Sequence, residues 1–155
     1  VRWYGGFDSM IVAQQFDMPI VAPSMGRKID REDEMDISHL PYMNWLEWIN
    51  NLSRFKYAVH LMPTQAAGTF TLNCAYHGIP CIGYKGLDTQ EQLHPLLSVG
   101  IGDLNTAKIL AQRLRIDKEF YEKCSKECKA LYEKSSFQEK NYIYTMNKVI
   151  REVTE

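Results

Sequence analysis

The sequence lacks the features that mark membrane-spanning, secreted or nucleic-acid-binding chains. No apolar run in its 155 residues approaches the roughly 18 that a membrane-spanning helix needs. Its start has no basic segment followed by an apolar one, as a signal peptide would. Lysine and arginine number 18 and acidic residues 19, so the charge gives no reason to expect nucleic-acid binding. These absences predict a cytoplasmic protein without a nucleic-acid partner.

Motifs for metal ions are also absent from the sequence. There is no Asp-x-Asp motif, and the four cysteines contain no C-x2-C pair of the kind that structural zinc sites use. We therefore expect no metal and no cofactor. Because cysteine is readily buried, Cys74, Cys81, Cys124 and Cys128 are expected to be reduced and mostly buried thiols.

Strand-like and helix-like segments alternate along the chain. The expected strands are residues 1–6, 18–22, 57–62, 81–83 and 96–99. The expected helices are residues 7–16, 45–54 with Asn44 as N-cap, 69–77, 104–114 after Asp103, and a helix after Asp117 that runs to about residue 134. A capping box at Ser136 and Glu139 opens a last helix, with Tyr142, Met146, Val149, Ile150 and Val153 on one face. Residues 23–39 form the least structured part, and Gln90 and Gln92 flank a turn.

This alternation predicts an α/β fold. Short apolar strands separated by helices of about 10 residues indicate a parallel sheet that is covered on both faces. Right-handed crossovers then give a doubly wound, Rossmann-like sheet, followed by C-terminal helices. At 155 residues the chain is long enough for one domain with its own core.

The most informative stretch runs from His60 to Gly83 and predicts a strand, a loop, a helix and a second strand. Pro63 ends the first strand, small residues fill the loop up to Gly68, and Gly78 ends the helix. A helix that begins after such a loop points unpaired N–H groups at whatever lies above the sheet, and anions bind there. We expect the N–H groups from Ala67 to Thr71 to bind phosphate, with Gly68 allowing a close approach.

The same stretch resembles the donor-binding domain of GT-B glycosyltransferases, especially the glycosyl transferases group 1 family. Pro63-Thr64, Gly68, Gly78 and Pro80 fall in step with that family's spacing. Two glutamates of the family pattern, eight positions apart, fall on Gln65 and Asn73. From Leu40 onward the order of elements is also similar. The resemblance implies a chain that binds a nucleoside-diphosphate sugar without a metal.

The resemblance also implies roles for individual residues. Gln65 would lie near the sugar hydroxyls and Asn73 near the ribose, while the hydroxyls of Thr69 and Thr71 would assist in phosphate binding. Tyr42 is a further donor-binding candidate. His60, near the ligand end of a central strand, is a candidate for orienting phosphate or for proton transfer, although a histidine on a strand is more often structural. His94, Arg27 and Lys28 are similarly open between a binding and a structural role.

We thus expect residues 1–155 to be one Rossmann-like donor-binding domain, a fragment of a two-domain hexosyltransferase whose acceptor domain is missing. Such a fragment would transfer no sugar alone. Two alternatives remain open: a non-catalytic sugar-nucleotide-binding module that has lost the family acids, or a GT-B-like epimerase or phosphorylase. Among partners, peripheral membrane association of the whole protein and self-association through the C-terminal helix also remain open.

Overall fold

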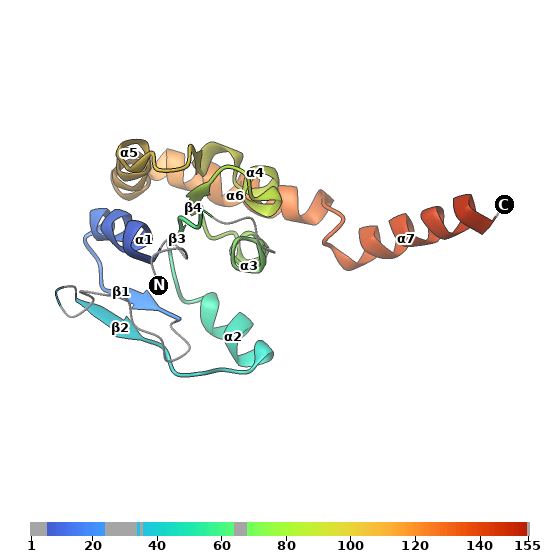
Figure 1. Cartoon of the computed structure of the whole chain (residues 1–155), viewed down its shortest axis with the longest axis horizontal. Helices are drawn as coiled ribbons and strands as arrows, with labels where there is room; N and C mark the ends of the chain where they lie inside the picture. Colours follow the sequence, from blue (N-terminus) through green and yellow to red (C-terminus); the bar gives the residue numbers. More distant parts are fainter. Residues whose placement is uncertain (1–5, 24–33, 35, 64–67, 155) are drawn as a thin grey trace.

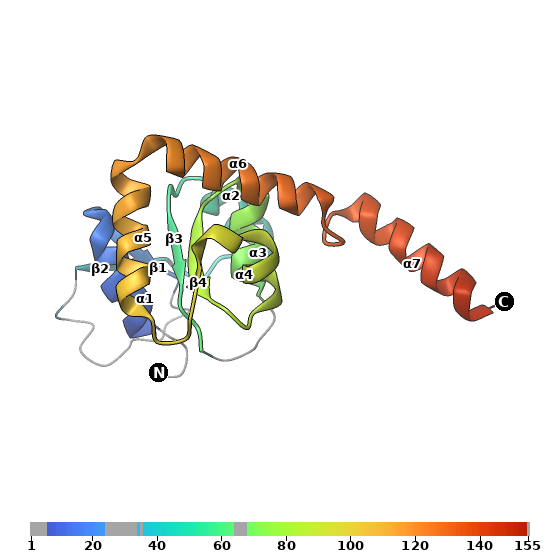
Figure 2. The ribbon, with the colours of Figure 1, turned by 90° about the horizontal axis from the view of Figure 1, so that it is seen from above.

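The computed structural model of the chain describes residues 6–23, 34, 36–63 and 68–154. Within this part, helices surround short parallel strands, and the C-terminal helix extends away from the body in both views (Figures 1 and 2). No helix of the described residues is both long and apolar enough to cross a membrane. Of the strand expected at residues 1–6, residues 1–5 lie outside the described part, and Gly6 begins a helix and does not end a strand.

Two separate parallel sheets contain the strands. The strands are β1 (Ile20–Ala22), β2 (Ile37–His39), β3 (Ala58–His60), β4 (Cys81–Tyr84) and β5 (Ser98–Val99). β1 pairs with β2, and the second sheet has the order β3-β4-β5. The prediction of an α/β fold with parallel strands is confirmed. The described strands do not form one doubly wound sheet, so that part stays a prediction.

Seven α-helices and two short 3-10 helices accompany the strands within the described residues. They are α1 (Gly6–Ala13), η2 (Gln14–Phe16), α2 (Trp45–Leu52), α3 (Thr69–His77), α4 (Asp88–Leu93), η4 (Pro95–Leu97), α5 (Leu104–Ile116), α6 (Lys118–Lys134) and α7 (Glu139–Thr154). α3 has the predicted bounds, and Gly78 ends it in the left-handed conformation with φ of 69°. Asn44, Asp103 and Asp117 cap their helices as predicted.

Both faces of the larger sheet are covered by helices. Ile82 and Tyr84 of β4 belong to a core cluster with residues of α1 and α5, such as Val12 and Ala111. Cys81 of β4 instead packs in a cluster with residues of α2 and α3. Because successive side chains of a strand point to opposite faces, this alternation places α1 and α5 on one face and α2 and α3 on the other. All four cysteines are free and buried, as predicted.

Three elements differ from the sequence prediction. Of the strand expected at residues 96–99, Leu96 and Leu97 belong instead to η4, and only Ser98 and Val99 form β5. Residues 37–39 form β2 inside the stretch expected to lack structure, and residues 88–93 form α4 where a turn was expected. β2 was not predicted because its sequence, Ile-Ser-His, contains only one residue that favours strands. α4 was not predicted because two of its buried residues, Thr89 and Gln90, are polar. Its apolar residues therefore show no helical period in the sequence.

The C-terminal helix buries none of its apolar side chains against the described part of the chain. α7 forms as expected, yet none of its residues is buried, and Tyr142 and Ile150 are 54% and 51% exposed. Its first turn is capped by Gln138, whose Oε1 accepts from the N–H of Lys140, and not by the predicted Ser136. Self-association through this face stays a prediction.

Candidate anion-binding site

The carboxyl ends of β3 and β4 lie at one edge of the sheet, and the first turn of α1 is bonded to both. The N–H of Leu61 donates to Ser9 Oγ over 2.9 Å, and the hydroxyl of Tyr84 donates to Asp8 Oδ2 over 2.9 Å. Burial and the neighbouring Asp8 raise the pKa of Tyr84 to about 12, so this hydroxyl keeps its proton. The N-terminus of α1 is therefore fixed at the ligand side of a parallel sheet.

The first turn of α3 reaches the same edge. Its N-cap is Gly68, which has no side chain to cap the helix, and the N–H of Leu72 makes the helix's first bond, to Gly68 O over 3.0 Å. The N–H groups of Thr69, Phe70 and Thr71 precede that bond, so the helix itself offers them no acceptor. Together with the helix dipole, they make a turn that favours an anion.

His60 lies beside the first turn of α3. It is the last residue of β3, and its ring lies 5.3 Å from the ring of Phe70 in the first turn of α3. Its Nδ1 is buried and has no hydrogen-bond partner among the described residues. Burial lowers the pKa of His60, so the imidazole is neutral at pH 7. In that state it can donate or accept a hydrogen bond but brings no positive charge.

Gly68 is held in place by two threonine hydroxyls. Its carbonyl oxygen lies 2.8 Å from Thr71 Oγ1 and 3.1 Å from Thr89 Oγ1, and the two hydroxyl oxygens are 2.7 Å apart. The two hydroxyl hydrogens of Thr71 and Thr89 are therefore shared among these three short oxygen–oxygen contacts. A Cβ added at Gly68 would overlap Thr89 Oγ1. The space left by the missing side chain of Gly68 is thus already filled by α4.

His94, at the end of α4, links α3 to β4. Its Nδ1 accepts from the N–H of Cys81 over 3.4 Å, and its Nε2 lies 3.0 Å from the carbonyl oxygen of Thr71. Because Nδ1 is the acceptor, Nε2 carries the proton and donates to Thr71. Burial lowers the pKa of His94 to about 4, which keeps this neutral form at pH 7.

Gln90 completes this link from one turn earlier in α4. Its Nε2 donates to the carbonyl oxygen of Cys81 over 3.0 Å. β5 is short and pairs with β4 at Gly83 and Tyr84, so it does not reach Cys81. The side chains of Gln90 and His94 thus satisfy the backbone groups of Cys81 that a longer β5 would pair.

Only some of the other predicted site residues lie in the described part of the chain and near this edge of the sheet. Gln65 and Ala67 lie outside the described residues, as do Arg27 and Lys28. Thr69 is exposed at the start of α3, whereas Thr71 is fully buried and uses its hydroxyl inside the fold. Asn73 is only 5% exposed, and Tyr42 is 81% exposed between β2 and α2, with no hydrogen bond to the described residues of the site. The structure therefore brings together His60, Gly68 and Thr69.

Several residues of this edge were not singled out as site residues from the sequence. Ser9 and Asp8 bond to β3 and β4 from a distant part of the chain, and Thr89 belongs to the helix that was predicted as a turn. Lys85, exposed directly after β4, adds a cation at the same edge. An Asp or a Ser in the first turn of a helix is a signal for its N-terminus, but it does not reveal which strand the side chain contacts.

The arrangement suits an anion better than a metal ion. Within the described residues, no three His, Cys, Asp or Glu side chains gather closely enough to hold a metal. In comparisons with known proteins, the chain matches no family model and no curated protein.

The protein should lose stability at low pH through His94. Its pKa is about 4 in the folded protein and about 6.5 in the unfolded chain. Between these values the unfolded state binds a proton that the folded state does not. The free energy of unfolding therefore falls as the pH drops from 6.5 to 4, and this contribution stays constant below pH 4. The full loss should be about 3 kcal/mol.

Urea unfolding at pH 7, 5 and 4 measures this loss, with His94→Gln as the control. Glutamine can still donate to Thr71 but does not titrate. The variant is expected to be less stable at pH 7 and to lose less stability on acidification. His60, whose pKa is also lowered by burial, adds the same sign to both proteins. Equal losses in the two proteins would contradict the role given to His94.

Gly68 and Thr89 should be coupled energetically. Gly68→Ala is expected to destabilise the protein by about 1–3 kcal/mol, because the new methyl group overlaps the Thr89 hydroxyl. Thr89→Ala removes that hydroxyl and costs about 1 kcal/mol. In the double variant the overlap is relieved, so its loss should be smaller than the sum by at least about 0.5 kcal/mol. Strict additivity in urea unfolding would show that the two residues do not meet.

Proposed function

We propose that this chain is the nucleotide-sugar-binding half of a GT-B glycosyltransferase and that α3 holds the donor's diphosphate. One observation carries the proposal: the uncapped first turn of α3 lies at the carboxyl edge of a parallel sheet, beside His60. The N-termini of α2, α5 and α6 are occupied by their own capping side chains, whereas those of α3 and the six-residue α4 are not. The N-terminus of α3 has no such side chain and so has donors to offer a ligand.

Glycosyl transfer from such a donor builds negative charge on the leaving diphosphate. Donors that are fixed before the reaction stabilise this charge without any reorganisation. The bonds from Thr89 and His94 to the backbone of Gly68 and Thr71 supply that rigidity, since they hold the first turn of α3 from outside the turn. In this proposal the residues of α4 are positioning residues and do not touch the donor.

The other residues of the edge take complementary roles in the proposal. Neutral His60 offers a hydrogen bond to the donor, and the ammonium group of Lys85 balances part of the diphosphate charge. Asn73 serves the ribose and Gln65 the sugar hydroxyls, as amides that both donate and accept. Catalysis by the complete protein needs an acceptor domain that forms the other wall of the cleft, so the present chain alone should not turn over the donor.

A non-catalytic sugar-nucleotide-binding module is the second candidate. Amides stand at both positions that resemble the family's acids, and hydrogen bonds to a neutral amide are about half as strong as those to a carboxylate. Asn73 is also almost fully buried, an environment that accommodates an amide at lower cost than a carboxylate. Turnover by the complete protein separates the two candidates, since both predict binding.

Calorimetric titration with UDP, GDP and ADP in the presence of a chelator tests donor binding. We expect heat from at least one nucleotide. Thr69→Glu should weaken that binding about tenfold, because a carboxylate several ångströms from the diphosphate repels it by roughly 1–2 kcal/mol. Thr69 is exposed, and a glutamate in the first turn of a helix is favourable for the helix itself, so this variant should fold.

Thr69→Gln is the matched control, since it has the size of glutamate without the charge. It loses the Thr69 hydroxyl but adds no charge, so it should weaken nucleotide binding less than Thr69→Glu does. Absence of heat with all three nucleotides in a folded sample would overturn the proposal. Equal weakening by glutamate and glutamine would mean that side-chain bulk, and not charge, matters at this position. It would contradict the binding of an anion at this turn.

A further inference from the structure

Asp8, in the first turn of α1, places a carboxylate at the carboxyl end of β4. Its Oδ2 accepts from the hydroxyl of Tyr84, the last residue of β4, over 2.9 Å. Asp8 is partly exposed, and its Oδ1 has no hydrogen bond or ion pair with the described residues. One oxygen of this carboxylate is therefore free to accept from a ligand.

Two hydrogen bonds fix the direction of this carboxylate. The ring of Tyr84 is packed in the core, and the side chain is only 2% exposed. Because burial and Asp8 raise the pKa of Tyr84 to about 12, its hydroxyl keeps its proton and donates it to Asp8. The next residue of α1, Ser9, accepts from the N–H of Leu61 over 2.9 Å. A polar group that is held in this way can bind a ligand without being reordered.

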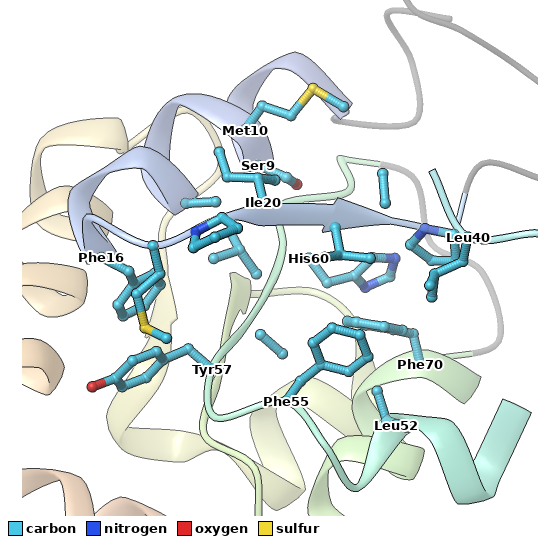
Figure 3. Close-up of a pocket in the computed structure, with 18 of the residues that line it drawn as sticks. Ser9, Met10, Phe16, Ile20, Leu40, Leu52, Phe55, Tyr57, His60 and Phe70 are labelled. Carbon is cyan, nitrogen blue, oxygen red and sulfur yellow. The ribbon is translucent and has the colours of Figure 1, made fainter. Parts of the chain in front are cut away.

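The first turns of α1 and α3 lie on either side of the carboxyl end of β3. Ser9, His60 and Phe70 line one cavity of about 450 Å³, and Figure 3 shows His60 between the other two. Asp8 is not among the described residues that line this mostly apolar cavity, and its bond to Tyr84 places it towards β4. Asp8 thus stands at the edge of the sheet to which the first turn of α3 belongs.

A carboxylate at this edge favours a neutral hydrogen-bond donor as its ligand. It repels a diphosphate, and it accepts hydrogen bonds but donates none. The hydroxyl groups of a sugar carry no charge and can donate to it. A hydrogen bond from a hydroxyl to a carboxylate is about twice as strong as one between neutral groups.

We propose that Asp8 binds a hydroxyl group of the donor's sugar and that Tyr84 is the positioning residue that orients it. This inference rests on the proposed function, since it needs a donor whose diphosphate lies at the first turn of α3. Tyr84 does not touch the sugar and acts through the carboxylate of Asp8. Asp8 consequently favours the nucleotide sugar over the free nucleoside diphosphate, which lacks the hydroxyl and is repelled.

Calorimetric titration of the unmodified chain and of Asp8→Asn tests the role of Asp8. The ligands are UDP-glucose, GDP-mannose and ADP-glucose, each compared with its own nucleoside diphosphate. Asparagine keeps an oxygen for the Tyr84 hydroxyl but replaces the other oxygen by an NH2 group, which accepts no hydrogen bond. The variant should therefore fold. The ratio of the affinity for the nucleotide sugar to that for its nucleoside diphosphate should fall about tenfold.

Asp103→Asn is the matched control for the loss of charge. Asp103 is exposed, and together with burial and Asp8 its charge raises the pKa of Tyr84, so it acts on the same hydroxyl. Asparagine can cap α5 as Asp103 does. The affinity ratio should change by less than about twofold, since a screened charge acts on both ligands. Equal falls in Asp8→Asn and Asp103→Asn would overturn the inference.

Tyr84→Phe tests the positioning role. It should lower the affinity ratio about threefold in the otherwise unmodified chain and cause no further fall when combined with Asp8→Asn. Independent effects of the two substitutions would contradict a role of Tyr84 through Asp8.

The same titrations separate this inference from the proposed function. An unchanged ratio in Asp8→Asn, in a chain that binds both ligands, would overturn the role of Asp8 and leave the proposed function standing. Absence of heat from every ligand in the folded, unmodified chain would overturn both.

Discussion

The neutral imidazole of His94 is the contact on which the candidate site depends most. It accepts from the N–H of Cys81 with one nitrogen and donates to the carbonyl oxygen of Thr71 with the other, so one side chain fixes α3 relative to β4. This is possible because burial holds its pKa near 4. A protonated ring would lose the acceptor and place an unpaired charge in the core.

The same contact explains why small and polar residues gather around α4. A Cβ at Gly68 would overlap the hydroxyl of Thr89, and a Cβ at Gly83 would overlap the amide of Gln90. Both glycines are therefore required by the close approach of α4 to its neighbours. The N-terminus of α3 is consequently held by α4 on one side, while on the other side Thr69 is exposed to solvent. A turn with these properties can bind an anion without rearranging.

Sequence reasoning located the regular elements whose signals are local. α3 could be placed to the residue because Gly68 and Gly78 bracket it, and α6 because Asp117 caps it. β2 and α4 could not, since Ser38 and His39 weaken a strand signal, while Thr89 and Gln90 are buried for their hydrogen bonds and not for hydrophobicity. The apolar face of α7 was predicted from the helical spacing of its apolar residues, but this spacing does not indicate what covers the helix.

The site was predictable to a similar extent. The strand, loop and helix from His60 to Gly83 indicated an anion-binding turn, and the structure places His60 against that turn. The role of Gly68 was not predictable, because the atom that occupies its free space belongs to Thr89, 21 residues later. Thr71 was expected to face a ligand but is fully buried, since its hydroxyl completes the bonds to Gly68. Such long-range contacts leave no pattern in a single sequence.

Chemical-shift mapping tests most directly the claim that the first turn of α3 is an anion-binding turn. The backbone amides of the labelled chain would be followed by NMR while the nucleoside diphosphate that gives heat is added without metal. We expect the amides of Thr69, Phe70 and Thr71 to shift most, with smaller changes at His60 and Ser9. Shifts confined to other surfaces, such as α6 or α7, with no change at the start of α3, would contradict it.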